Sequence, residues 1–497
     1  MGIVRNQGIK NMLSAYTGVV LGYINVILLF PAYFTSEQFG LINLLISVSF
    51  VYTQFSSVGL VNAISKYFPF FKTDDKRHNF FLTYIIVLSV SGFFIITLLF
   101  FVFKPLIIDA YINNSKLFVD YFLLLIPLAF SLLVYVIFET LARVIFRTVL
   151  ANFIREVVIR ILTTADIVLF IYNIVDFTGF IYVFVGIYML SALIIVLQVI
   201  ISREFKFIFS IKGMEKRHFV EFLRYGTYNL FSGAAMFVGQ KVDIMMIGSM
   251  IGLSIVGAYS LYLFIATVIS IPMRAFSKIA IPIIANSWKE NDIKQINDIY
   301  KRTSLIQMIL GMLLYIGVII NKHNLFIIVK KTEYIENFDI FYFLGIAFLI
   351  DVAVGLNSEI ISSSKYYKYD ALFNLIMLVV SIATNFIFIP ILGGVGAAIA
   401  AATSFFVFNF SKWLFLYIKY KMQPVDFKQL FVLILGFVCV GVNYFIPQLN
   451  NVYLDIIFRS GIITLIFMSV LYFTKMSFDL NDRINTYINL IIHRKNF

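Results

Sequence analysis

The segment FFLTYIIVLSVSGFFIITLLFFVF, residues 80–103, contains no charged residue. A helix needs about 20 mostly apolar residues to cross ~30 Å of hydrocarbon, so this segment is long enough to span a bilayer. Segments of the same kind recur along the chain, which is 61% hydrophobic and only 13% charged. A soluble domain carries roughly 25% charged residues. The sequence therefore predicts an all-α polytopic membrane protein.

About fourteen transmembrane helices are predicted from the apolar windows and from the charged or Pro/Gly breaks between them. The windows cover roughly residues 11–33, 40–65, 80–103, 117–138, 150–172, 179–201, 221–249, 255–280, 303–321, 339–361, 370–390, 395–418, 428–447 and 454–474. The first window is interpreted as a retained helix, because it is longer than the ~7–15 residues of a signal-peptide core.

The basic residues predict the orientation of these helices. If the N-terminus is cytoplasmic and the loops alternate, 29 of the 39 Lys and Arg residues, Lys412 among them, fall on the cytoplasmic side. The six on the outer side are Lys104, Lys116, Lys322, Lys330, Lys331 and Arg459. This asymmetry follows the positive-inside rule, and it predicts an even number of helices with both chain ends in the cytoplasm.

The predicted spans divide into two similar halves and a C-terminal addition. The expected parts are a six-helix bundle over 1–205, a second six-helix bundle over 219–420, two further helices over 428–474 and a cytoplasmic tail over 475–497. Helix two opens with Glu37–Asn43, and helix eight opens in a similar way with Ser254–Ser260. Because six is an even number, both halves run in the same direction, as in parallel repeats with a substrate path between them.

Several kinds of site are not predicted by this sequence. The single cysteine, Cys439, excludes an intrachain disulfide and a cysteine metal cluster. The four histidines are far apart, and no GxxxxGK[ST] phosphate-binding loop is present, so neither a metal nor a nucleotide cofactor is expected. The net charge of +13 is explained by a basic cytoplasmic face beside anionic lipid headgroups, without a nucleic-acid partner.

The fifth predicted helix contains charges that are costly in lipid. Glu156 and Arg160 are four residues apart, so they lie on one helical face and can pair. A charge at the bilayer centre costs ~2.5–3.5 kcal/mol on insertion scales, and such residues usually face protein or water. Two interpretations stay open: an internal ion pair that fixes helix packing, or a pair that lines a cavity.

Helices two and seven carry polar stripes. Asn43 and Gln54 lie on helix two, and Asn229, Lys241 and Asp243 lie on or beside one stripe of helix seven. Such stripes suit sugar hydroxyls, but they also suit tight helix–helix contacts. Two residues apart, Lys241 and Asp243 cannot share a helical face, so at least one of them needs another partner or a water-filled space.

Helix ten places Asp351 in the middle of an apolar span. A carboxyl group at that depth is neutralised by burial, paired with a partner, or used in cation coupling. A functional role for Asp351 is favoured over a structural one.

Four segments resemble a known family. Gln240–Gly248 with Val256–Ser260, and Asn385–Pro390 with Gly393–Ala400, are similar to segments of bacterial polysaccharide and O-antigen flippases of the Wzx type. Phe39-Gly40 and the N-terminal helix extend the similarity over the whole chain. This family belongs to the multidrug/oligosaccharidyl-lipid/polysaccharide exporter superfamily.

The resemblance implies a fold, a function and a location. The fold would be MATE-like, with two six-helix bundles around a central cavity and two extra C-terminal helices. The protein would be no enzyme but a flippase in the bacterial inner membrane, which moves an undecaprenyl-pyrophosphate-linked oligosaccharide to the outer leaflet for surface polysaccharide or lipopolysaccharide O-antigen synthesis. Its partners would be this lipid-linked oligosaccharide, membrane lipids, and Na+ or H+ as a coupling ion.

The resemblance also implies roles for the polar residues inside the membrane. The substrate cavity would contain Arg160, Lys241, Asn43, Gln54 and Asn229. Family cavities are often basic, and with few basic residues in helices one and two, Arg160 and Lys241 would supply much of the charge for an anionic pyrophosphate. The coupling or ion-pair residues would be Glu156, Asp243 and Asp351.

Two other functions are weighed against the flippase. One is a cation-coupled small-molecule or multidrug antiporter of the same fold, which would differ in its lipid-facing gate and cavity size. The other is a membrane polysaccharide polymerase or ligase, which would need a sizeable outer loop. The longest outer loop here, at about residues 322–338, is short.

Overall fold

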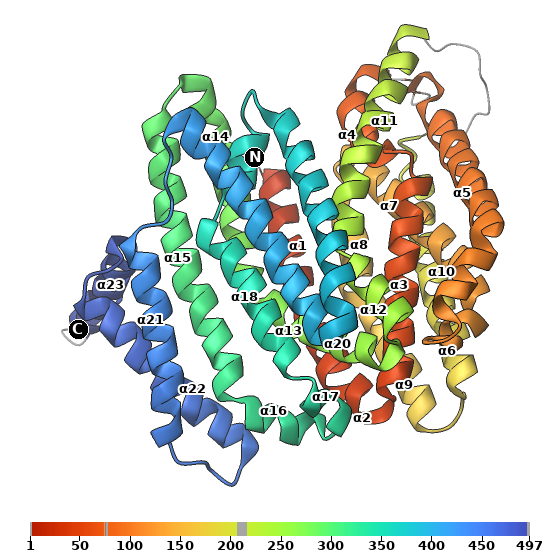
Figure 1. The fold of residues 1–497 in the computed structure, drawn as a ribbon. Coiled ribbons are helices and arrows are strands. Elements are labelled where there is room, and N and C mark those ends of the chain that lie inside the picture. Colours follow the sequence, from red (N-terminus) through yellow and green to blue (C-terminus); the bar gives the residue numbers. More distant parts are fainter. Residues whose placement is uncertain (1, 74, 76–77, 206–215, 495–497) are drawn as a thin grey trace. The chain divides into compact units, whose positions relative to one another are not determined.

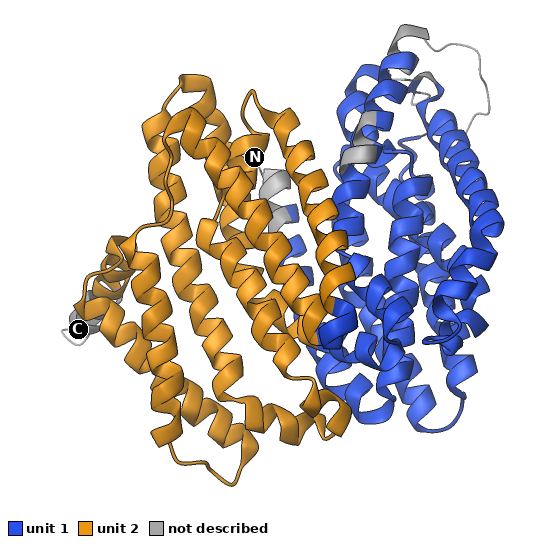
Figure 2. Cartoon of the chain, viewed as in Figure 1, with its two compact units in different colours: residues 1–261, 389–394 blue, residues 262–388, 395–497 orange. Residues whose placement is uncertain are grey.

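The computed structural model describes residues 2–73, 75, 78–205 and 216–494. These residues form helices joined by short connections, and no strand occurs among them (Figure 1). The chain divides into two compact units (Figure 2). Unit 1 comprises residues 1–261 and 389–394, and unit 2 comprises residues 262–388 and 395–497.

Ten helices within the described ranges are long and apolar enough to cross a membrane. They are Lys10–Tyr33, Ser36–Ser56, Phe81–Tyr111, Phe122–Val144, Phe177–Ile201, Leu253–Glu290, Ile293–Ile320, Tyr367–Tyr420, Phe427–Phe445 and Val452–Phe473. The prediction of an all-α, multi-pass membrane protein is confirmed. The number fourteen stays a prediction. Each predicted window that is not among these ten helices differs from them for a local reason, described below.

The predicted fifth helix is a run of three segments. These are α8 (Thr148–Phe153), the π-helix η4 (Ile154–Val158) and α9 (Ile159–Ile171). A π-helix has one extra residue in its turn and often marks a functional site. The run contains four charged residues, which is why it does not count among the long apolar helices.

The predicted seventh and tenth helices are interrupted. α11 (Lys216–Gly239) is separated by two residues from α12 (Val242–Met250). α18 (Asp339–Val354) is likewise separated from α19 (Asn357–Ser362). The second break is at Gly355, whose φ of 72° and ψ of −127° suit glycine, because a Cβ atom disfavours positive φ.

The predicted eleventh and twelfth helices form one long element, α20 (Tyr367–Tyr420). Its regular geometry is broken at Gly393, where φ is 57° and ψ is −132°. Asp370 and Lys412, 42 residues apart in the chain, form an ion pair. The two parts of α20 therefore fold back on each other as a hairpin.

Unit 1 is built around α7 (Leu125–Val144), which packs against α3 (Ser36–Ser56) and α10 (Phe177–Ile201). Aromatic rings fill much of the interior; Phe34, for example, stacks on Phe170 with ring centroids 4.4 Å apart. Aromatic pairs in this distance range add to the stability that burial provides.

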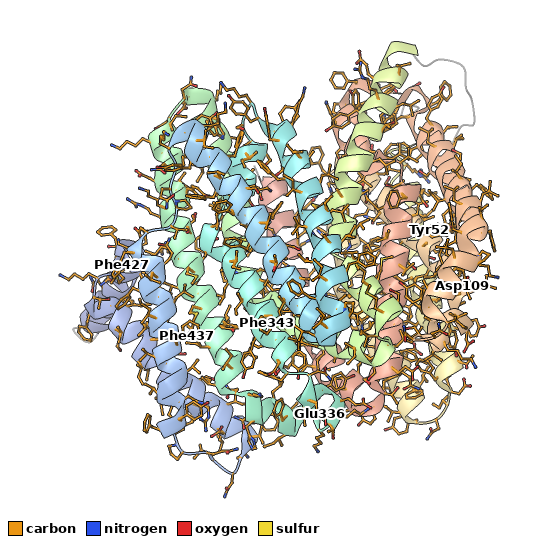
Figure 3. All side chains as sticks on the ribbon, viewed as in Figure 1. Tyr52, Asp109, Glu336, Phe343, Phe427 and Phe437 are labelled. Carbon is orange, nitrogen blue, oxygen red and sulfur yellow. The ribbon has the colours of Figure 1, made fainter. Side chains whose placement is uncertain are left out.

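Two outer helices complete unit 1. α5 (Phe81–Tyr111) packs against α3, where the Tyr52 hydroxyl is 2.5 Å from the Thr97 hydroxyl (Tyr52 is labelled in Figure 3). α1 (Gly2–Tyr23) packs against α8 and η4. The fifth helix, with its charges, is therefore held between α1 and the centre of the unit.

A close helix crossing joins α3 to the beginning of α13 (Leu253–Thr267) within unit 1. A Cβ atom on Gly40 would lie 1.9 Å from the Leu253 carbonyl oxygen, and one on Gly257 would lie 2.2 Å from the Ser36 carbonyl oxygen. The Ser36 and Ser254 hydroxyls are 2.6 Å apart. Only glycine permits this backbone approach, so the similar openings of helices two and eight are in direct contact.

Unit 2 is built around α15 (Ile293–Ile320), which packs against α14 (Ile271–Glu290), α18, α21 (Phe427–Val442) and α22 (Val452–Phe473). The outer surface of α21 is strongly apolar: Phe427 and Phe437 are 70% and 65% exposed (Figure 3). Exposed side chains of this size are solvated by lipid in a membrane protein.

Candidate functional site

The ion pair of the fifth helix lies against α1. Arg160 Nη1 is 3.0 Å from Glu156 Oε2, and both side chains keep nearly a third of their surface exposed. On α1, a Cβ atom at Gly18 would lie 2.3 Å from Arg160 Nη1 and 2.6 Å from the Glu156 carbonyl oxygen. Glycine at this position gives the guanidinium its space. Because the pair is only partly buried, its charges can reach a ligand.

Asn25, in the first predicted helix, links that helix to the fifth helix through hydrogen bonds. It lies in the π-helix η1 (Ile24–Leu29) and is buried. Its Nδ2 donates to the Arg160 carbonyl oxygen at 3.0 Å, and its Oδ1 accepts from the Thr164 hydroxyl at 2.7 Å. Asn25 is not among the site residues predicted from the sequence. In the sequence, Asn25 could have been recognised as the single amide within an apolar stretch that ends near Pro31.

A cavity of about 630 Å³ continues this groove toward the predicted cytoplasmic end of unit 1. Lys10 and Arg147 supply cations to its wall, and Ser14 and Phe153 line it one turn before Gly18 and Glu156. Arg147 is 3.7 Å from a carboxylate oxygen of Glu204, with both side chains substantially exposed. The groove between α1 and the fifth helix therefore contains three cationic side chains along more than one turn, Lys10, Arg147 and Arg160, among apolar neighbours.

At the break in the seventh helix lies a half-buried lysine without a counter-ion among the described residues. Lys241 lies between α11 and α12, with its Nζ 5.8 Å from the centroid of the Phe50 ring. Its side chain forms no hydrogen bond or ion pair with the described residues. Asp243 is buried and accepts a hydrogen bond from the Tyr259 hydroxyl at 2.7 Å. Tyr259 is therefore a partner that sequence reasoning did not identify.

The polar residues of helix two face different neighbours. Asn43 donates to the Phe39 carbonyl oxygen of its own helix at 2.9 Å. Gln54 lies against α11, where a Cβ atom at Gly233 would lie 2.6 Å from Gln54 Nε2. Asn229 lies in α11, and its side chain is outside the described part of the structure. Gln54 and Lys241 thus belong to the contacts of α3 with α11 and α12, whereas Glu156 and Arg160 contact α1.

Asp351, near the end of α18 in unit 2, is linked through two amides to α19, the second part of the broken tenth helix. Asn409 of α20 donates to Asp351 Oδ1 at 3.1 Å, and Asn357 donates to Asn409 Oδ1 at 2.8 Å. Asn357 opens α19, directly after the break at Gly355. Interrupted helices at membrane depth commonly provide binding groups for ions and substrates.

A second polar group lies on the same hairpin. Lys412 is only 1% exposed, and its Nζ is 2.7 Å from Asp370 Oδ1 and 2.8 Å from the Ser358 hydroxyl. Its Nζ also lies 4.0 Å from the Phe408 ring centroid. Counting Lys412 among the basic residues of the cytoplasmic side overlooked this burial. The sequence does place Lys412 inside the apolar window 395–418, and this position could have indicated that the lysine is buried in the membrane opposite Asp370.

Replacing Lys412 by leucine is expected to destabilise unit 2, because Asp370 would keep its charge without a partner. Breaking a buried pair costs about 3 kcal/mol at the low end of the usual range, which applies because Asp370 is partly exposed. Thermal unfolding of the purified protein in detergent measures the effect. The double variant Lys412→Leu with Asp370→Leu should recover most of the lost stability; equal loss in both variants would contradict this account.

No group of three or more His, Cys, Asp or Glu side chains suited to a metal ion occurs in the part of the chain that the structure describes.

Apolar helices with internal charges, a hairpin and interrupted spans define a polytopic helical membrane protein. The chain belongs to the polysaccharide biosynthesis protein family, whose model matches residues 4–288. No curated protein matches the sequence significantly.

Solved structures agree on the fold. A lipid II flippase, MurJ, in an inward closed conformation matches with a TM-score of 0.72 at 17% identity, covering 95% of this chain and 99% of that one. A multidrug resistance MATE family transporter of the MOP superfamily, in an inward-facing conformation, matches with a TM-score of 0.60 at 14% identity, covering 83% and 94%. A Vibrio cholerae MATE transporter, VcmN, matches at 0.52 and 12%, covering 85% and 99%. The predicted MATE-like fold is confirmed.

Proposed function

We propose that this protein is a flippase that moves an undecaprenyl-pyrophosphate-linked oligosaccharide across the bacterial inner membrane by alternating access. The chain's membership of the polysaccharide biosynthesis family supports this proposal. The observation that carries it is the groove of unit 1 with its cationic side chains, where Arg160 stands about two turns beyond a cavity that Lys10 and Arg147 line. A pyrophosphate is an anion that arginine and lysine recognise strongly.

Lys241 is the second proposed contact for the anionic head. It has no counter-ion among the described residues, and it stands where α11 is interrupted. An unpaired lysine inside a membrane protein is costly unless water or a ligand reaches it. Gln54 and Asn43 on α3 would contribute hydrogen bonds to the sugar hydroxyls, with Asn229 on α11, while Asp243 would orient Tyr259.

A direct assay tests the proposed function. The purified protein would be placed in liposomes with a fluorescent polyprenyl-pyrophosphate oligosaccharide, and loss of fluorescence on adding an impermeant reductant would report which leaflet holds the label. The flippase proposal expects protein-dependent exchange of the label between leaflets. Labelled lipid that stays inaccessible with the active protein present would overturn it.

The second candidate is a cation-coupled small-molecule antiporter, which the fold shared with a MATE transporter favours. The same liposomes distinguish the two, because an antiporter moves a soluble organic cation against a Na+ or H+ gradient and leaves the lipid-linked label in place. Glycan export from cells that lack the gene and carry the plasmid-borne protein gives an independent answer.

We further propose that Asp351 takes part in coupling to Na+ or H+. Its carboxylate and the amides of Asn409 and Asn357 place several oxygen atoms at the break of the tenth helix. Asp351→Asn removes the charge but keeps the shape, so the protein should fold while transport loses its dependence on the cation gradient. Transport rates in liposomes with and without each gradient measure this. Asp109→Asn, an exposed change on α5, is the matched control, and an unchanged cation dependence in Asp351→Asn would contradict the role.

A further inference from the structure

A second cavity, of about 560 Å³, lies in unit 2, away from every residue assigned to transport above. It is lined by the C-terminal turns of α15 and α21, the beginning of α16 (Lys322–Val329) and the beginning of α22. All of these segments fall on the predicted outer side of the membrane. Lys322 and Arg459, two of the six basic residues predicted on that side, both line it.

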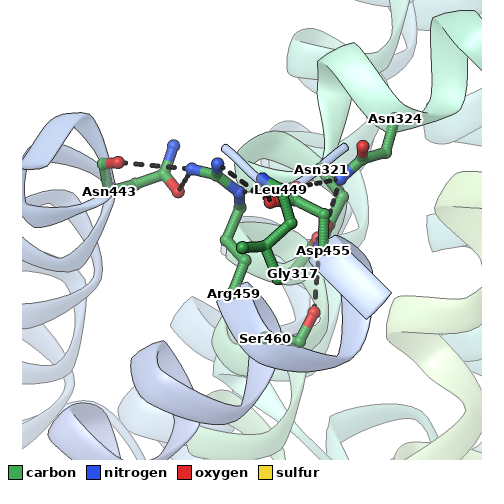
Figure 4. A network of polar contacts seen from close by, with 8 residues as sticks. All are labelled: Gly317, Asn321, Asn324, Asn443, Leu449, Asp455, Arg459 and Ser460. Carbon is green, nitrogen blue, oxygen red and sulfur yellow. Dashed lines mark hydrogen bonds and ion pairs between the residues drawn. The ribbon is translucent and has the colours of Figure 1, made fainter. Parts of the chain in front are cut away.

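One wall of this cavity is a buried polar network (Figure 4). Asp455 accepts hydrogen bonds from Arg459 Nε at 3.1 Å, from Asn324 Nδ2 at 2.6 Å and from the Leu449 backbone N–H at 2.8 Å. Arg459 Nη1 also donates to Asn443 Oδ1 at 2.7 Å. The Arg459 and Asp455 side chains are only 9% and 1% exposed. The charged groups of this network are paired with each other. The network therefore holds the wall of the cavity in place and adds no net charge to it.

Lys322 is the cation of this cavity that the network does not neutralise. Its Nζ lies 4.6 Å from the centroid of the Phe338 ring and 5.5 Å from those of Phe326 and Tyr342. Within the described ranges its side chain forms no ion pair or hydrogen bond. The three aromatic faces hold the ammonium group in place by cation–π attraction and supply no counter-charge. A bound anion would supply it.

The other unsatisfied group is a hydrogen-bond acceptor. Asn324 is buried, and its Oδ1 has no hydrogen-bond partner. A buried polar atom without a partner costs about 1–3 kcal/mol, so a ligand that donates a hydrogen bond there would be stabilised. The cavity therefore offers a cation for an anion and an acceptor for a hydroxyl or amine.

Much of the remaining wall is made of apolar and aromatic side chains. Ile316, Ile319, Phe437 and Tyr444 line the cavity; Tyr444 is 86% exposed, and Phe445, the next residue in the chain, is 88% exposed. Exposed aromatic side chains of this kind are enriched where a membrane protein meets the headgroup layer. A ligand that enters here is thus expected to be amphiphilic.

We infer that this cavity binds the phosphate headgroup of a lipid, with Lys322 facing the phosphate and Asn324 accepting a hydrogen bond from a headgroup hydroxyl or amine. Arg459 and Asp455 are positioning residues for the wall. A glycerophospholipid and a polyprenyl phosphate share the phosphate that this cavity would recognise. The inference goes beyond the proposed transport of a lipid-linked oligosaccharide and does not depend on it, because none of its residues belongs to unit 1.

The test is a binding measurement on the full-length protein in neutral detergent. Short-chain phosphatidylglycerol, a polyprenyl phosphate and the uncharged lipid diacylglycerol are the probes, and retained lipid is counted by native mass spectrometry. The wild-type protein should retain a phosphorylated lipid and not diacylglycerol. Lys322→Gln should weaken retention about tenfold or more, the effect of losing a charge-assisted contact, and Lys322→Arg should restore it.

Controls keep the result interpretable. Lys330→Gln removes an exposed lysine from the other end of α16 and should leave binding unchanged. Val440→Phe fills the cavity without changing its charge and should also weaken binding, which provides a second test if Lys322→Gln does not fold. Retention of only one phosphorylated probe would support the site and identify its source. Equal retention of phosphorylated lipid by wild type, Lys322→Gln and Val440→Phe would overturn it.

Discussion

Cells whose only copy of this protein carries Arg160→Ala are expected to lose export of surface glycan while the protein still inserts into the membrane. Arg160 is the basic side chain that projects into the groove between α1 and the fifth helix. Loss of one charge-assisted contact is worth about 1.5–3 kcal/mol, which corresponds to at least about a tenfold slower transport step. Surface glycan measured by immunoblot, normalised to the amount of membrane protein, gives the answer.

A matched pair of variants separates function from folding here. In Arg160→Ala, Glu156 is left without its partner, so a defect could reflect an unpaired carboxylate. The double variant Glu156→Gln with Arg160→Gln removes both charges; if the pair is only structural, export returns. Continued loss of export in a stable double variant supports a role in binding. Arg302→Ala, which removes an arginine from an exposed pair with Asp479, should export normally.

Lys241→Ala is also expected to reduce the export of surface glycan, and it should affect folding less than Arg160→Ala does. Removing Lys241 leaves no ion-pair or hydrogen-bond partner behind within the described residues, where its side chain contacts the Phe50 ring. Normal export in both Lys241→Ala and Arg160→Ala would show that these charges are structural.

Cross-linking Ser36 to Ser254 as a cysteine pair is expected to stop transport reversibly. The two hydroxyls are 2.6 Å apart at the Gly40–Gly257 crossing, so the pair Ser36→Cys with Ser254→Cys should form a disulfide in this conformation. If alternating access requires α3 and α13 to separate at the predicted outer side, the disulfide holds this end closed. Export or liposome exchange should fall to background and return with a permeant reductant.

The design of this experiment is simple because the chain has one native cysteine, Cys439, which is buried and can be replaced by serine. Each single cysteine variant is the control and should transport as the wild type does. Gly40→Leu provides the opposite perturbation, since a side chain there meets the Leu253 carbonyl oxygen and forces the helices apart. Full transport by the cross-linked protein would rule out a moving contact at this crossing.

The class of protein could be predicted from the sequence because hydropathy depends only on local composition. Windows such as 80–103 and 179–201 became α5 and α10 with small changes of boundary. The interruption at Gly355 could not be predicted in the same way, since an isolated glycine in an apolar run also occurs in unbroken transmembrane helices. Its positive φ and its contact with Ser304 arise from packing against α15.

The partners of the site residues were predicted only where they lie on one helix. Glu156 and Arg160 follow from the four-residue spacing. The hydrogen bond of Asp243 with Tyr259 and the support of helix five by Asn25 depend on how different helices pack, which no periodicity encodes. The similar openings at Gly40 and Gly257 were recognised as a repeat, but their contact with each other was not expected.

The ion pair between Asp370 and Lys412 has a consequence for how the chain is made. During synthesis the two arms of α20 emerge one after the other, and the second arm brings a lysine that costs several kcal/mol to place alone in lipid. Asp370, already synthesised, offers the neutralising partner within the same hairpin. We therefore expect the two arms to leave the insertion machinery together. In a chain that ends before Lys412, the first arm of α20 should be inserted less stably in the bilayer.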